Sequence, residues 1–246
     1  MERKAYRYVD LITVLFVIVL VMSNILSSAK IVDWGVSLGG VPLAFDAGTL
    51  LFPVGYIFGD ILTEVYGFKR SRRVIWMGFF GLAVCSLLLY GVRILPGEAL
   101  WEQSVGQRAF DAVFGGMTSG GIVVASLLGY WLGEFSNSFV LARMKLMTRG
   151  RWLWTRTVGS TLIGEGIDTL AFVGAATLFG VFPPALFVTL VVTNYLFKVG
   201  VEVLMTPLTY AIVGRLKAAE GVDVYDIGTD FNPFRLRDDR TAAAKP

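Results

Sequence analysis

The sequence predicts an all-α membrane protein, a bundle of six transmembrane helices with both termini in the cytoplasm. Three observations favour this class. Only 17% of the 246 residues are charged, against about 25% in an average soluble domain, and the mean hydropathy is +0.65. Six apolar runs are long enough to span a membrane, which takes about 20 helical residues. Most basic residues fall on one side of these runs.

The six apolar runs supply the predicted helices, at 10–29, 41–66, 74–95, 119–142, 157–180 and 186–214. Membrane-spanning strands would instead show about 10 residues of alternating polarity. Inside lipid, a helix satisfies all of its own backbone groups. The first run is longer than the apolar core of a cleavable signal peptide, so we expect it to remain as a helix. Residues 95–118 predict a long external connection with a short surface helix, and Pro183-Pro184 predicts a tight external turn.

The distribution of Lys and Arg sets the predicted orientation. Of the 22 basic residues, 18 lie in the N-terminal segment, the loops after the second and fourth runs, and the C-terminal tail. They are Arg3, Lys4, Arg7, Lys69, Arg70, Arg72, Arg73, Arg143, Lys145, Arg149, Arg151, Arg156, Arg215, Lys217, Arg235, Arg237, Arg240 and Lys245. Basic loops stay in the cytoplasm, so we expect both termini on that side of the membrane.

This orientation divides the chain into two predicted parts. Residues 1–215 form a six-helix transmembrane domain, and residues 216–246 form a cytoplasmic tail. Within the tail, the aromatic side chains between Asp226 and Phe234 are expected to dock on the cytoplasmic face of the bundle.

The composition excludes several kinds of chemistry. The chain contains no histidine, which removes histidine-based zinc sites, Ser-His-Asp triads and histidine proton relays. The one cysteine, Cys85, lies inside the third run, so no disulfide forms within the chain. The net charge of +3 reflects orientation in the membrane and leaves no basic face for nucleic acid. We expect no enzyme activity, metal, cofactor or nucleic-acid partner, while association with a second copy stays open.

A short repeat links the second and fourth runs. Residues 55–60 read Gly-Tyr-Ile-Phe-Gly-Asp, and residues 129–134 read Gly-Tyr-Trp-Leu-Gly-Glu. Both runs go from outside to inside, so the match indicates either a parallel internal repeat or chance. In either case, small residues four apart let helix backbones approach closely, and we expect close packing at these glycines.

Carboxylates inside the apolar runs are the strongest functional signal. Ionisable groups in a membrane are costly and typically mark a functional site. Side chains three or four residues apart share a helix face. Such pairs are Asp60 with Glu64, Glu165 with Asp168, and Lys198 with Glu202, and Asn24, Glu134, Asn137 and Asn194 add polar groups in the other runs. The sequence therefore predicts a central polar pocket.

Structural roles for these residues remain open at this point. Lys198 and Glu202 can neutralise each other, and Glu64 can be a solvated helix end. Asn24 and Asn137 can act as links between helices, worth about 0.6 kcal/mol on average. An excess of buried negative charge favours a ligand that donates hydrogen bonds or carries positive charge. Aromatic side chains that could stack on a flat ligand are Phe45, Trp76, Trp131, Tyr195 and Phe197.

Four strings resemble the queuosine-precursor transporter family, also called vitamin uptake transporter-like. They are Gly59-Asp60-x-x-Thr63-Glu64-x-Tyr66-Gly67 followed by Arg72-Arg73; Ser160-Thr161-Leu162-x-Gly164-x-x-x-Asp168-Thr169-Leu170-Ala171-Phe172; Phe197-Lys198-Val199; and Phe231-Asn232-Pro233-Phe234. The resemblance covers roughly residues 20–235. No single string is diagnostic, but their order within six runs is specific.

The resemblance implies import of 7-deazaguanine precursors of queuosine, namely the 7-cyano and 7-aminomethyl forms or queuine. It also implies a six-helix fold similar to the substrate-binding subunits of energy-coupling-factor transporters. Carried over by position, the implied substrate-binding residues are Asp60, Asp168 and Lys198, followed by Glu64, Glu165 and Asn24. Glu134 and Asn137 join the predicted site from the polar pattern alone. The substrate is then a small purine-like base.

Functions other than import by this chain alone are also compatible with parts of the pattern. One is a vitamin- or base-binding membrane subunit that needs a separate ATPase module, since the chain has no Walker A loop. Transport by the chain alone would separate this alternative from a self-sufficient transporter. An intramembrane hydrolase would need a nucleophile motif that the sequence lacks, and a channel would need repeated rings of charge.

Overall fold

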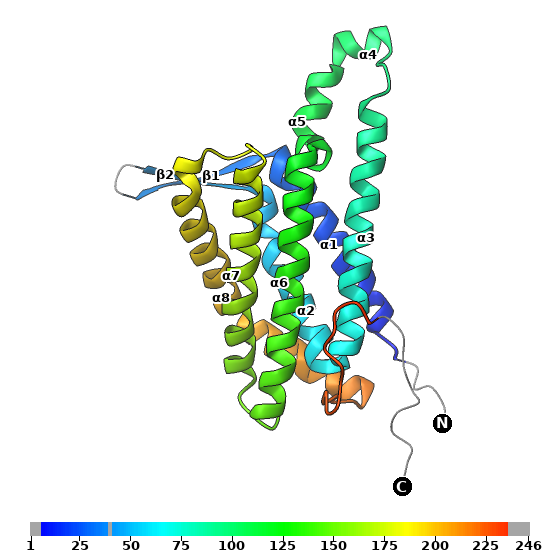
Figure 1. The fold of residues 1–246 in the computed structure, drawn as a ribbon, viewed down its shortest axis with the longest axis vertical. Coiled ribbons are helices and arrows are strands. Elements are labelled where there is room, and N and C mark those ends of the chain that lie inside the picture. The colour runs from blue at the N-terminus through cyan, green and yellow to red at the C-terminus, as the bar shows by residue number, and fades with distance from the viewer. Residues whose placement is uncertain (1–5, 39–40, 236–246) are drawn as a thin grey trace.

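The structure, a computed structural model, describes residues 6–38 and 41–235. It is a bundle of long helices with one small hairpin at the end opposite the described chain termini (Figure 1). The helices are α1 (Val9–Ala29), α2 (Phe52–Tyr66), α3 (Phe68–Arg93), α4 (Ala99–Ser104), α5 (Gly106–Thr118), α6 (Gly120–Met147), α7 (Leu153–Leu178) and α8 (Phe187–Glu220). The hairpin is β1 (Ile31–Leu38) and β2 (Val41–Asp46), and the 3₁₀ turns are η1 (Ala47–Leu50) and η2 (Pro184–Leu186).

Five segments of the described chain are long and apolar enough to cross a membrane. They are α1, α3, the consecutive helices α5 and α6, α7, and α8 with the short turn η2. Large apolar side chains on the outside of these helices are exposed, for example Leu87, Val188 and Leu204. Such a surface suits lipid rather than water, because a bilayer provides no hydrophobic penalty for exposed apolar groups.

The second apolar run departs from the prediction. Residues 41–66 do not form one helix: β2 pairs antiparallel with β1, η1 follows, and α2 has only 15 residues. Pro53 lies in the first turn of α2, where its missing N–H is tolerated, and it cannot continue a helix from upstream. At 1.5 Å per residue, α2 is about 22 Å long, shorter than the roughly 30 Å of a hydrocarbon core.

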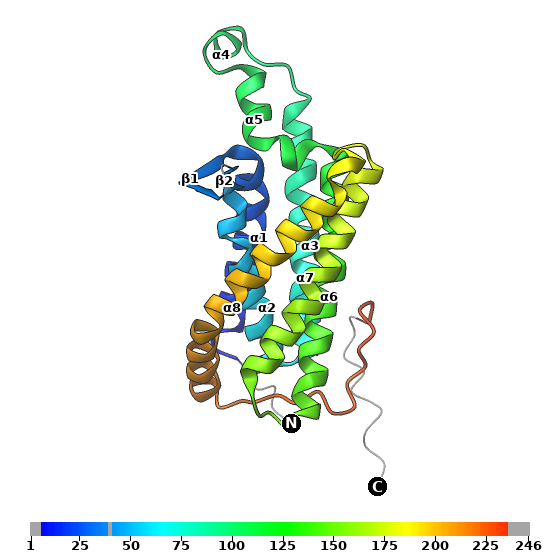
Figure 2. The ribbon, with the colours of Figure 1, turned by 90° about the vertical axis from the view of Figure 1, so that its left-hand side faces the viewer.

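The external connection contains more helix than the sequence suggested. Residues 95–118 carry the short helix α4, as expected, and also α5, which continues into α6 after Ser119. Together with the end of α3, these helices project beyond the rest of the bundle (Figures 1 and 2). Arg93 of α3 donates to Asp111 of α5 at 2.8 Å and joins the two arms of this projection.

Helices α6 and α7 pack against each other through glycine. A Cβ atom on Gly133 would lie 2.6 Å from the Cβ of Asp168, and one on Gly164 would lie 2.7 Å from the Cβ of Asn137. Real Cβ atoms do not approach this closely, so only glycine permits the contact. The predicted close packing is confirmed for Gly59, Gly129 and Gly133, whereas Gly55 faces open space.

Helix α8 crosses the bundle diagonally and then bends (Figure 2). Pro207 lies inside this 34-residue helix. Proline removes a backbone donor and clashes with the preceding turn, which kinks a helix. The bend lets the first half of α8 follow α7 while the second half lies across α2. The predicted domain boundary at 215 falls inside α8, which continues to Glu220.

The described ends of the chain meet at one end of the bundle, which we call the basic end. Glu220 accepts hydrogen bonds from the backbone N–H groups of Arg7 and Tyr8 at 3.1 and 2.8 Å. These groups precede α1, whose first turn has free donors. The loops between α2 and α3 and between α6 and α7 lie at the same end (Figure 1).

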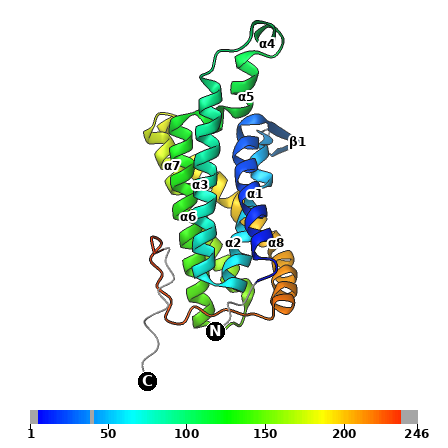
Figure 3. The ribbon, with the colours of Figure 1, turned by 90° about the vertical axis from the view of Figure 1, so that its right-hand side faces the viewer.

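The segment 221–235, which we call the C-terminal strap, runs across the basic end and turns up beside α6 (Figure 3). Asp226 accepts the N–H of Phe68 at the start of α3, at 3.0 Å. The residue before Phe68 is Gly67, whose φ is +82°. A Cβ atom on Gly67 would lie 2.7 Å from the side chain of Val224, so glycine lets the strap approach this turn closely.

Side-chain donors and aromatic rings hold the rest of the strap. Arg72 and Trp76 donate to strap carbonyls. Phe231 contacts the rings of Phe68 and Phe139, and Phe234 contacts Trp76 and Trp131. The expected docking of the tail aromatics on the bundle is confirmed.

Candidate functional site

A cavity of about 750 Å³ lies between α1, α2, α6, α7 and α8. Its volume falls within the range of roughly 300–1,000 Å³ typical of ligand pockets. Apolar atoms make up most of the wall surface, and polar side chains converge on it from several helices. The polar lining residues are Ser23, Asn24, Ser27, Tyr56, Ser126, Tyr130, Glu134, Asp168, Thr169, Thr189, Thr193, Asn194 and Lys198.

Lys198 is the centre of charge in this cavity. Its ammonium group donates to Asp168 and lies 3.1 Å from Oε2 of Glu165. The side chains of Lys198 and Asp168 retain 16% and 13% of their exposure, whereas Glu165 retains 2%. A ligand in the cavity can therefore reach Lys198 and Asp168, while Glu165 supports the lysine from behind. The predicted shared face of Glu165 and Asp168 is confirmed, and both carboxylates lie against Lys198 of α8.

Glu134 of α6 lines the same cavity. It is buried, and its Oε2 has no hydrogen-bond partner among the described residues. A Cβ atom on Gly59 would lie 2.8 Å from this oxygen. The glycine of the first repeat string therefore leaves space for Glu134, the acid of the second string. Glu134 is thus an available acceptor held between α2 and α6.

Asp60 and Asn137 lie deeper, out of contact with the cavity. Both are fully buried, and Nδ2 of Asn137 donates to Oδ1 of Asp60 at 2.9 Å. In the described chain, Oδ2 of Asp60 and Oδ1 of Asn137 have no partner. Asn137 therefore links α6 to α2, in agreement with the alternative in which it connects helices. One oxygen of Asp60 and the side-chain oxygen of Asn137 still accept no hydrogen bond from the described residues.

Glu202 lies one helical turn after Lys198 on α8. It is 2% exposed, and neither of its carboxyl oxygens has a hydrogen-bond partner in the part of the chain that the structure describes. No ion pair joins it to Lys198 there, because the lysine turns to α7 instead. The alternative in which Lys198 and Glu202 neutralise each other is wrong for this structure.

Glu64 lies apart from the cavity, at the basic end. Its Oε1 accepts from Arg156 at 2.7 Å and from Lys217 at 2.6 Å, and Lys145 lies 3.4 Å away. Asp223 of the C-terminal strap joins the same cluster through Lys145 and Lys217. Glu64 is neither a solvated helix end nor a cavity residue, and it fastens α2 to α6, α7, α8 and the strap.

Of the remaining candidate residues, some line the cavity and others pack elsewhere in the bundle. Asn24 lines the cavity, and its Nδ2 donates to the carbonyl of Leu20 in its own helix. Phe197 also lines the cavity. Trp76 and Trp131 pack with the strap, and Tyr195 donates to the carbonyl of Leu162. The side chain of Phe45 lies outside the described residues.

Two tyrosines in the cavity wall escaped the sequence analysis. Tyr56 and Tyr130 both line the cavity and are buried. Tyr130 donates to the carbonyl of Ile75 at 2.9 Å, while the hydroxyl of Tyr56 lies beside Gly133. They occupy equivalent positions in the two Gly-Tyr-x-x-Gly-acid strings. That repeat was the signal that could have identified them.

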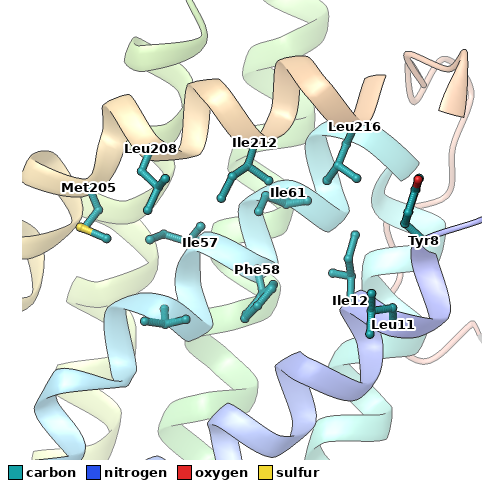
Figure 4. Close-up of a pocket in the computed structure, with 11 residues that line it drawn as sticks. Tyr8, Leu11, Ile12, Ile57, Phe58, Ile61, Met205, Leu208, Ile212 and Leu216 are labelled. Carbon is teal, nitrogen blue, oxygen red and sulfur yellow. The ribbon is translucent and has the colours of Figure 1, made fainter. Parts of the chain in front are cut away.

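A second cavity of about 250 Å³ lies between α1, α2 and α8 (Figure 4). Its lining is apolar except for the hydroxyl of Tyr8. The side chains of Met205, Leu208, Ile212 and Leu216 project from α8 toward α2. This cavity offers no charged or converging polar groups, so it does not match the chemistry of the larger one.

These features define a multi-pass membrane protein with a polar cavity inside its helical bundle. A family model described as "Putative vitamin uptake transporter" matches residues 46–212. The chain belongs to this family, which confirms the resemblance seen in the sequence. The family implies a small-molecule substrate and a membrane setting.

Three bacterial relatives match the chain. "Probable queuosine precursor transporter" of Bacillus subtilis (strain 168) is 26% identical over 165 residues, covering 67% of this chain and 69% of the relative. The protein of the same name from Haemophilus influenzae is 24% identical over 169 residues, covering 68% and 67%. "Queuosine precursor transporter" of Escherichia coli (strain K12) is 30% identical over 149 residues, covering 60% and 61%. No solved structure matches.

Proposed function

We propose that this protein imports a 7-deazaguanine precursor of queuosine across the bacterial inner membrane. The substrate is the 7-cyano or 7-aminomethyl form, or queuine. The observation that carries the proposal is the ion pair of Asp168 and Lys198, which is open to a cavity large enough for a bicyclic base. Membership of the family and the names of its bacterial relatives support it.

The recognition chemistry follows from this pair. A guanine-like ring presents adjacent N–H donors on one edge and a carbonyl oxygen next to them. Asp168 accepts the N–H groups, and Lys198 donates to the carbonyl oxygen. A site built to hydrogen-bond one edge rejects ligands that lack it, because the buried polar groups are then left unpaired. Phe172 and Phe197, which line the cavity, stack on the flat ring.

Other polar side chains complete the proposed site. Glu165 holds Lys198 in place, and Asn24 and Glu134 offer further hydrogen-bonding groups from the cavity wall. Asp60 and Asn137 form the polar layer beneath. Glu64 takes no part in binding, since three basic side chains surround it at the basic end.

The proposed topology has six membrane spans with both termini in the cytoplasm. In addition to the five long apolar segments, we count helix α2 as a membrane span. It runs in the same direction as α6 (Figure 1). Although it is short, η1 and the hairpin extend the chain at its outer end. The basic end then faces the cytoplasm, with a transmembrane domain at 1–215 and a cytoplasmic tail at 216–246. We further expect the bundle to resemble the substrate-binding subunits of energy-coupling-factor transporters.

Binding to purified protein tests the substrate. Calorimetric titration with the 7-cyano and 7-aminomethyl bases and queuine should give saturable binding, whereas guanine should bind more weakly. Equal binding of guanine, or no binding of any deazaguanine, would overturn the proposed substrate class.

Transport by the chain alone tests the transporter against the ATPase-dependent alternative. Proteoliposomes that hold only this protein and unlabelled deazaguanine should take up labelled deazaguanine by exchange. Binding without exchange would instead favour a binding subunit that requires a separate ATPase module.

A further inference from the structure

Glu202 has no role in the proposed recognition of the base, yet it is among the most buried acids of the protein. It is 2% exposed, and both of its oxygens lack a hydrogen-bond partner in the described chain. Asp60 is fully buried beside Glu202, and its Oδ2 also lacks a hydrogen-bond partner among the described residues. Buried polar groups are nearly always hydrogen-bonded, so each exception needs an explanation.

The surroundings of Glu202 contain acids and one engaged base. The ionisable groups that act on it from the neighbouring helices are Tyr56 and Asp60 of α2, Glu134 of α6 and Glu165 of α7. On its own helix, Lys198 lies one turn away, but its ammonium group is held by Asp168 and Glu165. Within the described residues, therefore, no cation balances a charge on Glu202.

An isolated carboxylate in a membrane interior costs several kcal/mol, even after local relaxation. A bound cation would remove this penalty if several acids converged on it. However, among the described residues no group of three or more acids is arranged to hold a metal ion. A proton needs only one carboxylate oxygen, and it turns the side chain into a neutral carboxylic acid. The geometry thus favours a proton over a multivalent metal ion, and the sodium gradient in the experiment below tests the alkali cation.

We propose that Glu202, with Asp60 beside it, binds the proton that drives import of the deazaguanine. This inference rests on the proposed function. In the outward-facing state the carboxylate of Glu202 takes a proton from water on the outer side and becomes a carboxylic acid. In the inward-facing state it returns the proton to cytoplasmic water. No bond of the substrate forms or breaks, and one proton enters with each base.

Lys198 couples the two sites. While Glu202 is neutral, Lys198 stays with Asp168 and Glu165, and the recognition edge of the cavity is complete. Once Glu202 is charged, it competes for the ammonium group one turn away and draws it from Asp168. Proton binding therefore favours substrate binding, and by linkage the substrate favours the proton to the same degree.

Proteoliposomes with an imposed pH gradient test the inference. With the membrane potential clamped by potassium and valinomycin, the wild-type protein should accumulate labelled 7-cyano-7-deazaguanine when the lumen is more alkaline. One proton per neutral substrate allows up to about tenfold accumulation per pH unit. A protonophore should abolish the accumulation, and an inward sodium gradient should not replace the pH gradient.

The Glu202→Gln variant separates coupling from transport, because glutamine keeps the neutral shape and cannot lose a proton. It should still exchange labelled for unlabelled deazaguanine but should lose accumulation driven by the pH gradient. Thr206→Val is the matched control one turn further along α8, where the hydroxyl bonds to the carbonyl of Glu202. It removes no ionisable group and should retain accumulation.

The possible outcomes distinguish the two proposals. Accumulation by Glu202→Gln at the wild-type level, or wild-type accumulation that follows sodium and ignores pH, would overturn proton coupling while exchange still supports the transporter. If Glu202→Gln fails to exchange, the test uses the wild-type protein. An inward substrate gradient should then acidify the lumen, as reported by trapped pyranine. An unchanged lumenal pH would overturn the inference. Wild-type protein that binds no deazaguanine would instead overturn the proposed function.

Discussion

At the scale of single residues, one ion pair combines two properties that a recognition site requires. Asp168 and Lys198 hold each other in place, and each keeps a small part of its surface open to the cavity. Because Glu165 also contacts the ammonium group, the lysine remains anchored when a ligand engages Asp168. The pair is therefore prearranged for a ligand with a donor edge and a neighbouring acceptor.

Removing one acceptor from this edge tests the role of Asp168. The Asp168→Asn variant keeps the shape but replaces a carboxylate oxygen with an NH₂ donor. Losing a charged hydrogen bond typically costs about 1.5–3 kcal/mol, or roughly one to two decades in affinity. We expect calorimetry on the purified variant to show such a loss for the 7-cyano base.

The control for this variant is Asp111→Asn, the same substitution at an exposed ion pair outside the cavity. It should bind the base like the wild type. Wild-type affinity in Asp168→Asn would remove Asp168 from the site and leave it as a structural partner of Lys198.

Residue types and their spacing marked Asp168 and Lys198 as candidates for the polar pocket but did not indicate which side chains contact each other. The three-residue spacing of Glu165 and Asp168 placed both on one face of a helix, and Lys198 was the lysine within an apolar run. Glu64 matched the same kind of pattern with Asp60, four residues away. Its partners Arg156, Lys145 and Lys217 come from three other helices, and no local spacing indicates which helices meet.

At the scale of elements, the contact of α6 with α7 positions the site. Gly129 and Gly133 lie against Asp168, and Gly164 lies against Asn137. These glycines bring two backbones close enough for both polar side chains to lie at the helix interface. A small added volume here should therefore affect both stability and binding.

The Gly133→Ala variant tests this arrangement. Its Cβ would lie 2.6 Å from the Cβ of Asp168, so the helices must separate or Asp168 must move. Overpacking of this kind typically costs about 1–3 kcal/mol. We expect a lower melting temperature in detergent and weaker binding of the base.

The matched control is Gly200→Ala on α8, where an added Cβ meets nothing within 4 Å. Alanine is the better helix former by about 1 kcal/mol, so this variant should be as stable as the wild type or more so. An unchanged melting temperature in Gly133→Ala would contradict close packing at α6 and α7.

The C-terminal strap should respond to acid through Asp223. Burial acts to raise the pKa of Asp223, but the hydrogen bonds and charges of Lys145 and Lys217 outweigh it and hold the pKa below its usual 3.8. A carboxylate with a depressed pKa stabilises the fold above its unfolded pKa, and this contribution is lost as the pH falls through the folded pKa. The half-exposed pair should contribute less than about 1 kcal/mol.

Thermal unfolding of wild type and Asp223→Asn over a range of pH measures this contribution. The wild type should melt at a higher temperature at pH 6. The difference should begin to shrink as the pH falls below about 4 and should vanish once the pH is below the depressed pKa of the folded state. A difference that persists in acid would mean that the carboxylate charge is not what holds the strap.

Hydropathy predicted five of the elements and misjudged one. The runs that became α1, α3, α6, α7 and α8 are long and mostly uninterrupted, and such a pattern leaves helix as the one satisfied conformation in lipid. Residues 41–51 are also mostly apolar, but they form β2 and η1 before α2 begins at Phe52. Average hydropathy does not distinguish a strand from a helix, whereas Pro42, Gly48 and Pro53 marked the interruptions.

At the scale of the whole molecule, basic residues from distant parts of the chain gather at one end. Arg7, Arg72, Lys145 and Arg156 belong to four different segments, and each is tied to other segments there. Arg3, Lys4, Arg237, Arg240 and Lys245 lie outside the described residues. The cluster is also where the strap and the end of α8 hold the start of α1, so charge and packing single out the same face.

This arrangement predicts which end of the bundle faces the cytoplasm. Basic loops are retained on the cytoplasmic side during insertion, so the basic end should be inside and the α4–α5 projection outside. On a Cys85→Ser background, Ala219→Cys places a thiol at an exposed position of the basic end, and Gln103→Cys places one on α4. A membrane-impermeant maleimide added to intact spheroplasts should label position 103, and should label position 219 only after permeabilisation. Labelling of position 219 from outside would reverse the orientation.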